Sequence, residues 1–418
     1  MLLTHWLNRW RHGRERRRLR RPRHRAAVHP FLVWQAECLE ARTLLSNIVV
    51  TAANGVVHFN GDSGSHTVNA TIVSGNLHLV GSAGTTFTFN GTTNSTIDIP
   101  LSSIGVVKDI DVDMQAGDDS ITFDATGLGT ISGNVNFNLG NGTNTLVFTN
   151  ATVTGRLTVN GGDNADSVQL SNDTLGSLKV LSGNGNDTTT LTSVTMAATR
   201  GQGVRAAGGL DIKTGNGNDT TTLTTVTGAN TRRPASRWEI SQGSGNDTTT
   251  LTSVQTHARL RVTSADGNNV LTTNTSTFGA KVAVRLGDGQ NQINVNTSTF
   301  EKRAVLKTGD GSSSAISVEG STFNHAARFV ARGANAQVNV ESTGSGGATT
   351  TFHGRVVIRV PGPSAVVNFG SATSTDKVVF DRNVFVFGGE PEATVNVATA
   401  DTTFNKNLRL FRAKRVNV

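Results

Sequence analysis

Three glycine-rich turns near the middle of the chain hold the residues best suited to binding a metal ion. The turns read SGNGND, TGNGND and QGSGND, and they end on Asp187, Asp219 and Asp247. Calcium takes roughly six to eight oxygen ligands, and a stack of such turns offers carboxylates together with backbone carbonyls. These three aspartates are therefore candidate calcium ligands, with Ca²⁺ as the candidate cofactor. The alternative is a scaffold, in which each Asn or Asp side chain bonds locally to the backbone.

A row of basic residues is the second candidate site. Counted back from the last polar residue of each glycine turn, basic side chains recur ten, eight or six positions earlier; this basic stripe comprises Arg237, Arg259, Arg261, Lys281, Arg285, Arg303 and Lys307. If the units stack, Glu239 would neighbour Arg261, while the other basic residues form a row of like charges that needs counter-ions. An anionic polysaccharide of the cell surface or matrix would supply them. The alternative is a solvated face that discourages aggregation of sheet edges.

The sequence offers little support for catalysis. Polysaccharide lyases and glycosidases need carboxylates at a defined separation, or a basic residue near metal-binding acids. The single dense acidic row is Asp109, Asp111 and Asp113, and the next unit places Asn134, Asn136 and Asn138 opposite it. The histidines share no column or metal-binding spacing, so we expect them on the surface. We therefore expect no enzymatic activity; a β-helix polysaccharide lyase or glycosidase is the alternative, by analogy with fold.

These candidate sites sit on a repeat of about 22 residues. Its register is the last polar residue of each glycine turn, namely Asp119, Asn144, Asp166, Asp187, Asp219, Asp247, Asn269, Asn291 and Ser313. Apolar residues stand nine and seven positions before each register residue, which predicts a strand with one buried face. A second strand follows the turn, and Thr-Phe pairs such as those ending at Phe278 and Phe300 mark a third.

A unit this short cannot bury its own apolar face, so we expect identical units to stack in parallel. The predicted fold is all-β, a parallel β-helix or β-solenoid over residues 109–418. Two insertions, MAATRGQGVRAAGG and GANTRRPASRW, lengthen two of the units at one corner. Residues 47–108 alternate strands with Asn-Gly or Gly-Asn turns and are expected to form an irregular β region or an N-terminal cap.

The positive charge of the chain belongs to its first residues. Residues 1–25 hold ten arginines and one glutamate, a net +9, so the formal charge of +8 leaves −1 for residues 26–418. This distribution argues against a nucleic-acid-binding body. The one cysteine, Cys38, excludes a disulfide within the chain. No apolar run approaches the roughly 18 residues that a transmembrane helix needs.

Two short stretches resemble elements of known families. Residues 39–46, LEARTLLS, resemble the LExRxLLS element (LEPR-XLL domain) of many planctomycete proteins, with Ala41 where proline is usual. The resemblance implies export and makes residues 1–46 a basic leader ahead of a β-rich extracytoplasmic region. The glycine turns resemble the RTX-type calcium-binding nonapeptide GGxGxDxUx, which would place calcium at their aspartates.

We therefore expect an exported, non-catalytic structural or adhesive β-solenoid, extracellular or at the cell surface. A calcium-stabilised or anionic-glycan-binding module is one alternative. The β-helix carbohydrate enzyme is the other.

Overall fold

The computed structural model describes residues 45–197, 208–229, 236–342, 347–371 and 375–418. Residues 45–418 belong to one compact unit. Most of the predicted leader, residues 1–44, lies outside the described residues, as do the centres of the two predicted insertions.

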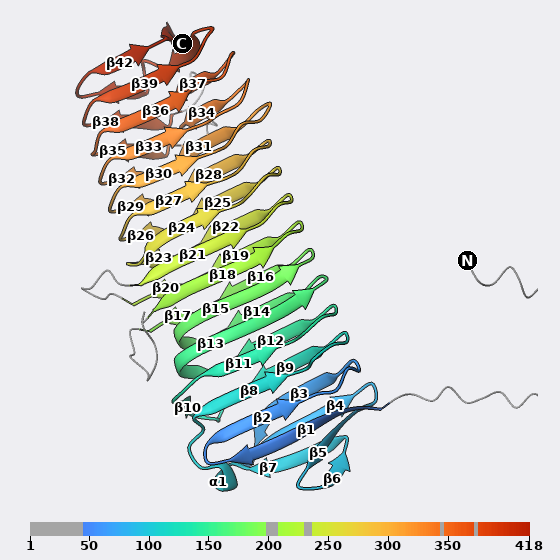
Figure 1. Cartoon of the computed structure of the whole chain (residues 1–418). Helices are drawn as coiled ribbons and strands as arrows, with labels where there is room; N and C mark the ends of the chain where they lie inside the picture. Colours follow the sequence, from blue (N-terminus) through green and yellow to red (C-terminus); the bar gives the residue numbers. More distant parts are fainter. Residues whose placement is uncertain (1–44, 198–207, 230–235, 343–346, 372–374) are drawn as a thin grey trace, which may run out of the picture. The chain divides into compact units, whose positions relative to one another are not determined.

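The described chain is all-β and winds into a parallel β-solenoid of about 12 turns, as the sequence predicts (Figure 1). Each coil contributes strands to three columns that run along the stack. The described residues contain one short helix, α1 (Leu101–Ile104). No described helix has the length and apolar character to cross a lipid bilayer.

The first column precedes the glycine turn and belongs to the larger, 27-stranded sheet. Its strands are β8 (Asp109–Asp113), β11 (Val135–Asn138), β13 (Thr152–Asp163), β15 (Thr174–Asn184), β18 (Gly209–Gly215), β21 (Arg237–Gln242), β24 (Arg259–Thr263), β27 (Val282–Arg285), β30 (Ala304–Lys307), β33 (Ala327–Val330), β36 (Val356–Val360), β39 (Val384–Gly388) and β42 (Leu408–Phe411).

The second column follows the turn and belongs to the 16-stranded sheet. Its strands are β9 (Ser120–Asp124), β12 (Thr145–Thr149), β14 (Ser167–Ser171), β16 (Thr188–Thr192), β19 (Thr220–Thr224), β22 (Thr248–Thr252), β25 (Val270–Asn274), β28 (Gln292–Asn296), β31 (Ala315–Glu319), β34 (Gln337–Val340), β37 (Val366–Phe369), β40 (Ala393–Val397) and β43 (Ala413–Asn417).

The third column consists of short strands that belong to the larger sheet. The initial residues of β13 and β15 take part in it, together with β10 (Thr130–Ile131), β17 (Thr195–Met196), β20 (Thr227–Gly228), β23 (Gln255–Thr256), β26 (Thr277–Phe278), β29 (Thr299–Phe300), β32 (Thr322–Phe323), β35 (Thr349–Phe352), β38 (Lys377–Phe380) and β41 (Thr402–Phe404).

The coil-to-coil register follows the predicted spacing. Leu260 pairs with Val282, and Val282 pairs with Ala304, so each of these coils holds 22 residues. Insertions lengthen other coils, and the mean is about 24 residues. One predicted register residue is wrong: the backbone N–H of Asn291 donates to Ser314 Oγ at 3.4 Å, not to Ser313, because this coil is one residue longer.

The apolar core occupies the inside of the solenoid. The predicted inward columns of the first strand are buried, from Ile110 to Leu306. The phenylalanines of the third column stack from coil to coil, with ring centroids of Phe300 and Phe323 4.6 Å apart and those of Phe323 and Phe352 4.8 Å apart. Stacking of identical side chains in this way lets each coil bury the apolar face of the next.

Residues 46–100 differ from the coils because they contain antiparallel pairs. Their strands are β1 (Ser46–Ala53), β2 (Val56–Asn60), β3 (Thr67–Val73), β4 (Asn76–Ser82), β5 (Thr85–Phe89), β6 (Thr92–Asn94) and β7 (Thr96–Pro100). The antiparallel pairs are β1–β2, β3–β4, β4–β7 and β5–β6. β2 and β3 then pair in parallel with β8 and β9 of the first coil. Apolar side chains such as Phe87 and Leu79 belong to the same core as the coils.

Candidate functional site

The register residues form a buried polar ladder at the corner between the first and second columns. Its members are at most 2% exposed and comprise Asp119, Asn144, Asp166, Asp187, Asp219, Asp247, Asn269 and Asn291. The backbone N–H of each of the first seven donates to the side-chain Oδ1 of the member in the next coil, at 2.8–3.1 Å. The ladder therefore satisfies a backbone donor that the corner would otherwise leave unpaired.

The asparagine members also bond to their own turn. Asn144 Nδ2 donates to the carbonyl oxygens of Gly140 and Gly142, each at 3.0 Å. Asn269 and Asn291 repeat this pattern with the carbonyls four and two residues earlier. An asparagine thus uses both ends of its amide, the oxygen for the previous coil and the nitrogen for its own turn.

An aspartate in the same place has no hydrogen to offer these carbonyls unless it is protonated. The Oδ2 atoms of Asp187 and Asp247 are buried and have no hydrogen-bond partner among the described residues. Burial, together with the neighbouring charges of Asp219 and Asp166, raises the pKa of Asp187 to about 7. Burial likewise raises the pKa of Asp247 to about 6. A proton on Oδ2 would let these residues bond as asparagine does.

Two further ladder aspartates, Asp219 and Asp166, have a donor for the second oxygen, whereas Asp119 Oδ2 has no hydrogen-bond partner among the described residues. Thr214 Oγ1 donates to Asp219 Oδ2 at 2.6 Å, and the backbone N–H of Gly162 donates to Asp166 Oδ2 at 3.1 Å. Burial still raises the pKa of Asp219 and of Asp166 above the ordinary value. The predicted calcium residues Asp187, Asp219 and Asp247 therefore do lie in consecutive coils, but inside the solenoid with Oδ1 already bonded to backbone.

The glycines of the repeated turns are fixed by close packing between coils. Gly217 has φ +141°, and a Cβ atom there would lie 1.6 Å from the carbonyl oxygen of Gly185. Gly245 has φ +140°, and its Cβ would lie 1.8 Å from the carbonyl oxygen of Gly217. Neither the backbone conformation nor the space admits a side chain. Packing alone therefore requires the glycine of each turn, with or without a metal ion.

The basic stripe lies on the outer face of the first column, around β21, β24, β27 and β30. Glu239 pairs with Arg237 at 2.5 Å and with Arg261 at 3.8 Å. The expectation that Arg237 lacks a counter-ion is therefore wrong. Among the described residues, no carboxylate lies within 4.0 Å of the remaining five, Arg259, Lys281, Arg285, Arg303 and Lys307.

Like charges in the stripe are direct neighbours on adjacent coils. Arg237 pairs in register with Arg259, and Arg285 pairs with Lys307. Burial, followed by the charges of Arg328, Arg285 and other arginines, lowers the pKa of Lys307. The stripe therefore carries an electrostatic cost that a bound anion would relieve.

A groove that the sequence did not reveal continues this basic surface into β33, β36 and β39. It consists of one hollow of about 850 Å³ and a second of about 440 Å³. Arg328 and Arg359 line both hollows, and Arg332 lines the larger one. After residue 325 the insertions break the 22-residue spacing, so the sequence could not align these arginines with the stripe.

Carboxylates lie at the turn side of the larger hollow. Asp266, Asp288 and Asp310 line it there, against five basic side chains. Asp266 and Asp288 each accept a backbone N–H from the next coil, at 2.9 and 2.8 Å. Asp310 Oδ2 lies 3.8 Å from Arg332. The larger hollow is therefore mixed in charge, whereas none of the described residues that line the smaller one is a carboxylate.

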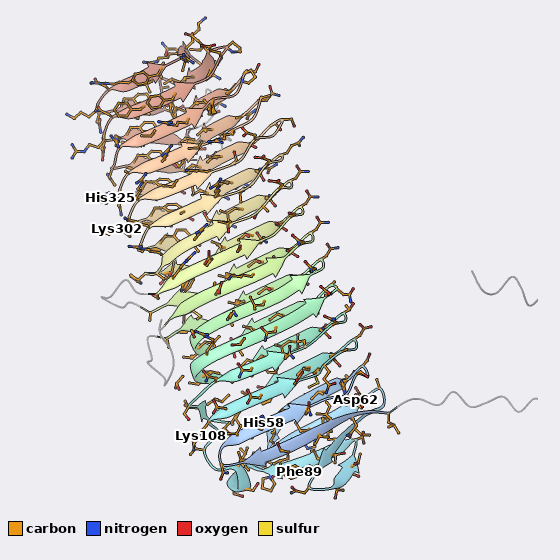
Figure 2. The ribbon with its side chains drawn as sticks, viewed as in Figure 1. His58, Asp62, Phe89, Lys108, Lys302 and His325 are labelled. Carbon is orange, nitrogen blue, oxygen red and sulfur yellow. The ribbon has the colours of Figure 1, made fainter. Side chains whose placement is uncertain are left out.

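The acidic row of β8 is used in hydrogen bonds between coils. Asn136 Nδ2 donates to Asp111 Oδ1 at 2.6 Å, and Asn138 Nδ2 donates to Asp113 Oδ1 at 3.0 Å. His58 lies on β2 (Figure 2). Its Nδ1 is 3.4 Å from Asp111 Oδ2. The pairing of β2 with β8 brings them together, which the sequence did not indicate.

The expectation that all histidines lie on the surface is wrong for His66. Its side chain is fully buried, and its Nδ1 lies 2.8 Å from Asp119 Oδ1. The backbone N–H of His66 donates to the same oxygen at 2.8 Å, so His66 occupies the first position of the polar ladder. The irregular N-terminal strands thus join the ladder as a coil does.

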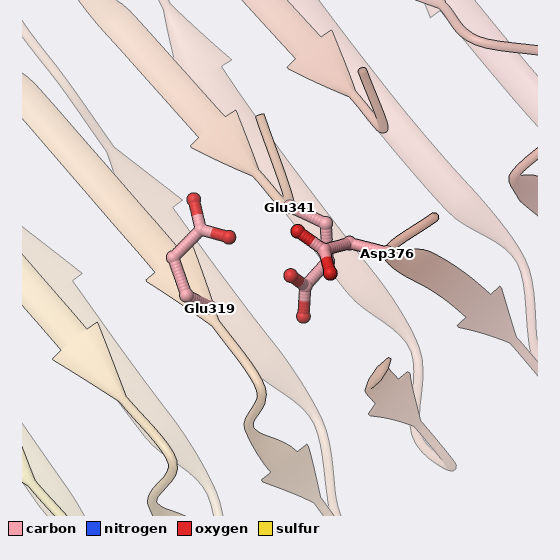
Figure 3. A group of neighbouring side chains, drawn as sticks. All are labelled: Glu319, Glu341 and Asp376. Atoms are coloured by element: carbon pink, nitrogen blue, oxygen red, sulfur yellow. The ribbon is translucent and has the colours of Figure 1, made fainter. Parts of the chain in front are cut away.

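Three acidic residues from successive coils meet at the corner between the second and third columns (Figure 3). Glu319, Glu341 and Asp376 each place one carboxylate oxygen within 4.8 Å of the other two. Glu341 is fully buried, and its Oε1 accepts hydrogen bonds from the Gly320 N–H and the Thr350 hydroxyl, each at 2.6 Å. Carboxylate oxygens are ligands that Ca²⁺ binds. Glu319 and Glu341 are one 22-residue repeat apart, but 35 residues separate Glu341 from Asp376, so the repeat spacing did not bring Asp376 into the cluster.

No family model matches the chain, and no curated protein or solved structure matches it. Its function must therefore be argued from its own surfaces.

Proposed function

We propose that the chain is an exported, non-catalytic structural or adhesive β-solenoid of the cell surface that binds anionic polysaccharide through its basic stripe. The observation that supports this is the row of five stripe cations without a carboxylate within 4.0 Å among the described residues. Export is supported by the resemblance of residues 39–46 to the LExRxLLS element of planctomycete proteins.

A linear polyanion suits the stripe because both repeat along one direction. Adjacent coils place cations about 4.8 Å apart along the stack. Arg285 and Lys307 are such neighbours, and their mutual repulsion falls when anionic groups lie between them. A polysaccharide with carboxylate or sulfate groups supplies these charges along its length, whereas a single small anion would neutralise only one step.

Binding to immobilised polygalacturonate, dextran sulfate and neutral dextran tests this proposal. We expect the full chain to bind both anionic chains, more weakly as salt rises, and not to bind dextran. The variant Arg285→Ala/Arg303→Ala/Lys307→Ala should bind about tenfold more weakly, a loss of about 1.4 kcal/mol. Because the arginine-rich leader is present in every variant, its own attraction for polyanions cancels in the comparison.

The control variant Lys108→Ala/Lys406→Ala removes two exposed cations that lie away from the stripe. It should bind within about twofold of the unmodified chain. Equal binding by the stripe variant and this control would overturn the proposal, as would binding that salt does not weaken.

Calcium binding by Asp187, Asp219 and Asp247 is the second candidate. The buried Oδ2 atoms of Asp187 and Asp247 support it, because each lacks a hydrogen-bond partner among the described residues and could instead coordinate a cation. A ligand that binds only the folded chain raises its unfolding midpoint. Calcium at millimolar concentration should then raise the midpoint relative to excess chelator, and an unchanged midpoint would exclude this candidate.

A further inference from the structure

The smaller hollow beside the basic stripe differs from the stripe in how its cations are held. We call it the arginine–phenylalanine groove. The arginine and phenylalanine side chains that line it are those of Arg303, Arg328, Arg355, Arg359, Phe385 and Phe387. It spans four successive coils at the level of β30, β33, β36 and β39. Four arginines and two aromatic rings therefore share a hollow of about 440 Å³ whose lining, within the described ranges, includes no carboxylate.

Two of the arginines lie over aromatic rings. The guanidinium carbon of Arg359 is 5.1 Å from the ring centroid of Phe387, its register partner on the next coil. The guanidinium carbon of Arg355 is 5.9 Å from the ring centroid of Phe385. Phe387 in turn stacks on Phe411, with centroids 4.7 Å apart, so its ring is fixed from the other side.

Stacking on a ring occupies one face of a guanidinium and leaves its N–H edge available. Such an edge donates two parallel hydrogen bonds to the paired oxygens of a carboxylate, sulfate or phosphate. Arg355 and Arg359 are both exposed, so a ligand reaches these edges directly. Fixing the guanidinium beforehand also lowers the conformational entropy that binding would otherwise cost.

Arg328 adds a donor that the protein does not satisfy. Its Nε is buried and has no hydrogen-bond partner among the described residues. Val305 and Val357 are its register neighbours, so the coils on either side offer no acceptor side chain at this position. A buried donor without a partner carries a free-energy penalty, which an oxyanion in the groove would remove.

We infer that the arginine–phenylalanine groove is a recognition site for the oxyanion groups of a linear acidic polysaccharide, held by bidentate hydrogen bonds from arginines stacked on Phe385 and Phe387. The inference rests on the proposed function and names its ligand chemistry. The basic stripe attracts the polymer by charge. The groove recognises the geometry of its carboxylate or sulfate groups through hydrogen bonds. Substitution of arginine by lysine keeps the positive charge but removes the planar guanidinium. It therefore separates the contribution of charge from that of bidentate hydrogen bonding.

The test uses the full chain and the charge-conserving variant Arg355→Lys/Arg359→Lys. Its affinity is measured for polygalacturonate, which carries carboxylates, for dextran sulfate and for single-stranded DNA. We expect about a tenfold loss for at least one of the two polysaccharides. The matched control, Arg156→Lys/Arg415→Lys, changes two exposed arginines that belong neither to the groove nor to the basic stripe and should lose less than about twofold. A greater loss on polygalacturonate assigns carboxylate as the ligand group, and a greater loss on dextran sulfate assigns sulfate.

Other outcomes overturn the inference. If the groove variant binds every probe as tightly as the control does, the arginines act only as point charges, and the inference fails while the proposed function stands. If the unmodified chain binds neither polysaccharide, the proposed function fails and takes the inference with it. Tighter binding of single-stranded DNA than of either polysaccharide would show that the ligand class is wrong. Equal unfolding midpoints for the variants will show that each has folded.

Discussion

The coils with aspartate in the polar ladder and the coils with asparagine share one backbone geometry but differ in the second atom of the side chain. In the aspartate coils, the N–H of Asp187 donates to Asp219 Oδ1 at 2.9 Å. In the asparagine coils, the N–H of Asn269 donates to Asn291 Oδ1 at 3.0 Å. The second atom of Asp187 is a carboxylate oxygen that has no hydrogen-bond partner in the described part of the chain, and that of Asn291 is a donating amide nitrogen.

The comparison shows that the fold requires an acceptor at this position and little more. Either residue type supplies Oδ1, and the following strands keep the same pairing, as between Thr248 and Val270 where the two kinds of coil meet. The aspartates therefore add a property that the asparagines lack, namely a buried group whose pKa is raised toward neutrality. The similar sequences of the turns are explained by packing between coils. The raised pKa of the aspartates is an additional property that packing does not require.

The largest expected effect comes from the glycines that both kinds of coil share. Gly217→Ala in an aspartate coil should destabilise the chain by more than about 4 kcal/mol, because of both its φ and the contact with the Gly185 carbonyl. Gly267→Ala should have a similar effect, because Gly267 has φ +144° and its Cβ would lie 1.8 Å from the Gly245 carbonyl oxygen. Denaturant unfolding of each variant measures this.

Gly129→Ala is the matched control for these two variants. Gly129 has φ +83°, and no atom of the residues that the structure describes lies within 4 Å of its added Cβ. It should lose only the conformational strain, about 1–2 kcal/mol. A loss at Gly217 no larger than the loss at Gly129 would show that the close approach between coils is not a packing requirement.

The pH dependence of stability should follow the aspartate coils. The pKa values of Asp187 and Asp247 in the folded chain, about 7 and about 6, exceed the ordinary value of 3.8. The protonated carboxyls therefore stabilise the folded chain fully below about pH 3.8, and this contribution is lost as the pH rises through about 6 to 7. Asp173, whose pKa burial raises to about 7, adds to the same trend. Each carboxyl should contribute on the order of 1–3 kcal/mol between pH 5 and pH 8.

Thermal unfolding of the full chain with excess chelator measures this trend. The midpoint should fall steadily from pH 5 to pH 8. A midpoint that rises over the same range would contradict protonated aspartates in the ladder.

A smaller loss of stability should appear when the ladder asparagine of one coil is replaced by aspartate. Asn269→Asp keeps the acceptor for Asp247 but loses the Nδ2 bonds to the Ala265 and Gly267 carbonyls. We expect a loss of about 1–2 kcal/mol at pH 8 and a smaller loss at pH 5, where protonation restores a donor. The control Asn268→Asp changes an exposed amide of the same turn and keeps the Oδ1 acceptor for the Gln290 N–H. Equal losses for Asn269→Asp at both pH values would argue against proton uptake.

The sequence predicted the fold because its signals are local and repeat. Alternating residues such as Leu260 and Val262 indicate one buried face, and the glycine turns fix the register. It did not predict which way the register side chains point, because a turn of the form GNGND is compatible with an aspartate directed outward to a metal or inward to the corner. The sequence also did not predict the contact between His66 and Asp119. These residues are 53 positions apart, and local spacing carries no signal for such a pairing.

The arginine–phenylalanine groove shows a second limit. Arg328, Val357 and Phe385 share one outward column, but the coils between them are 29 and 28 residues long. With the 22-residue spacing lost, these residues could not be assigned to the face that carries the basic stripe. Aromatic residues at outward positions were consequently not connected with the arginines that lie over them.

The most direct test of the central claim, that the ladder needs an acceptor while its aspartates hold protons, is the pH dependence of the double variant Asp187→Asn/Asp247→Asn. Its thermal midpoint is measured with excess chelator from pH 5 to pH 8, beside the unmodified chain and the control Asp163→Asn, an exposed turn carboxylate. The double variant should be the more stable at pH 8, and its midpoint should fall by about half as much, because Asp173 and the other buried carboxyls remain. Parallel curves for the double variant and the unmodified chain would contradict the claim.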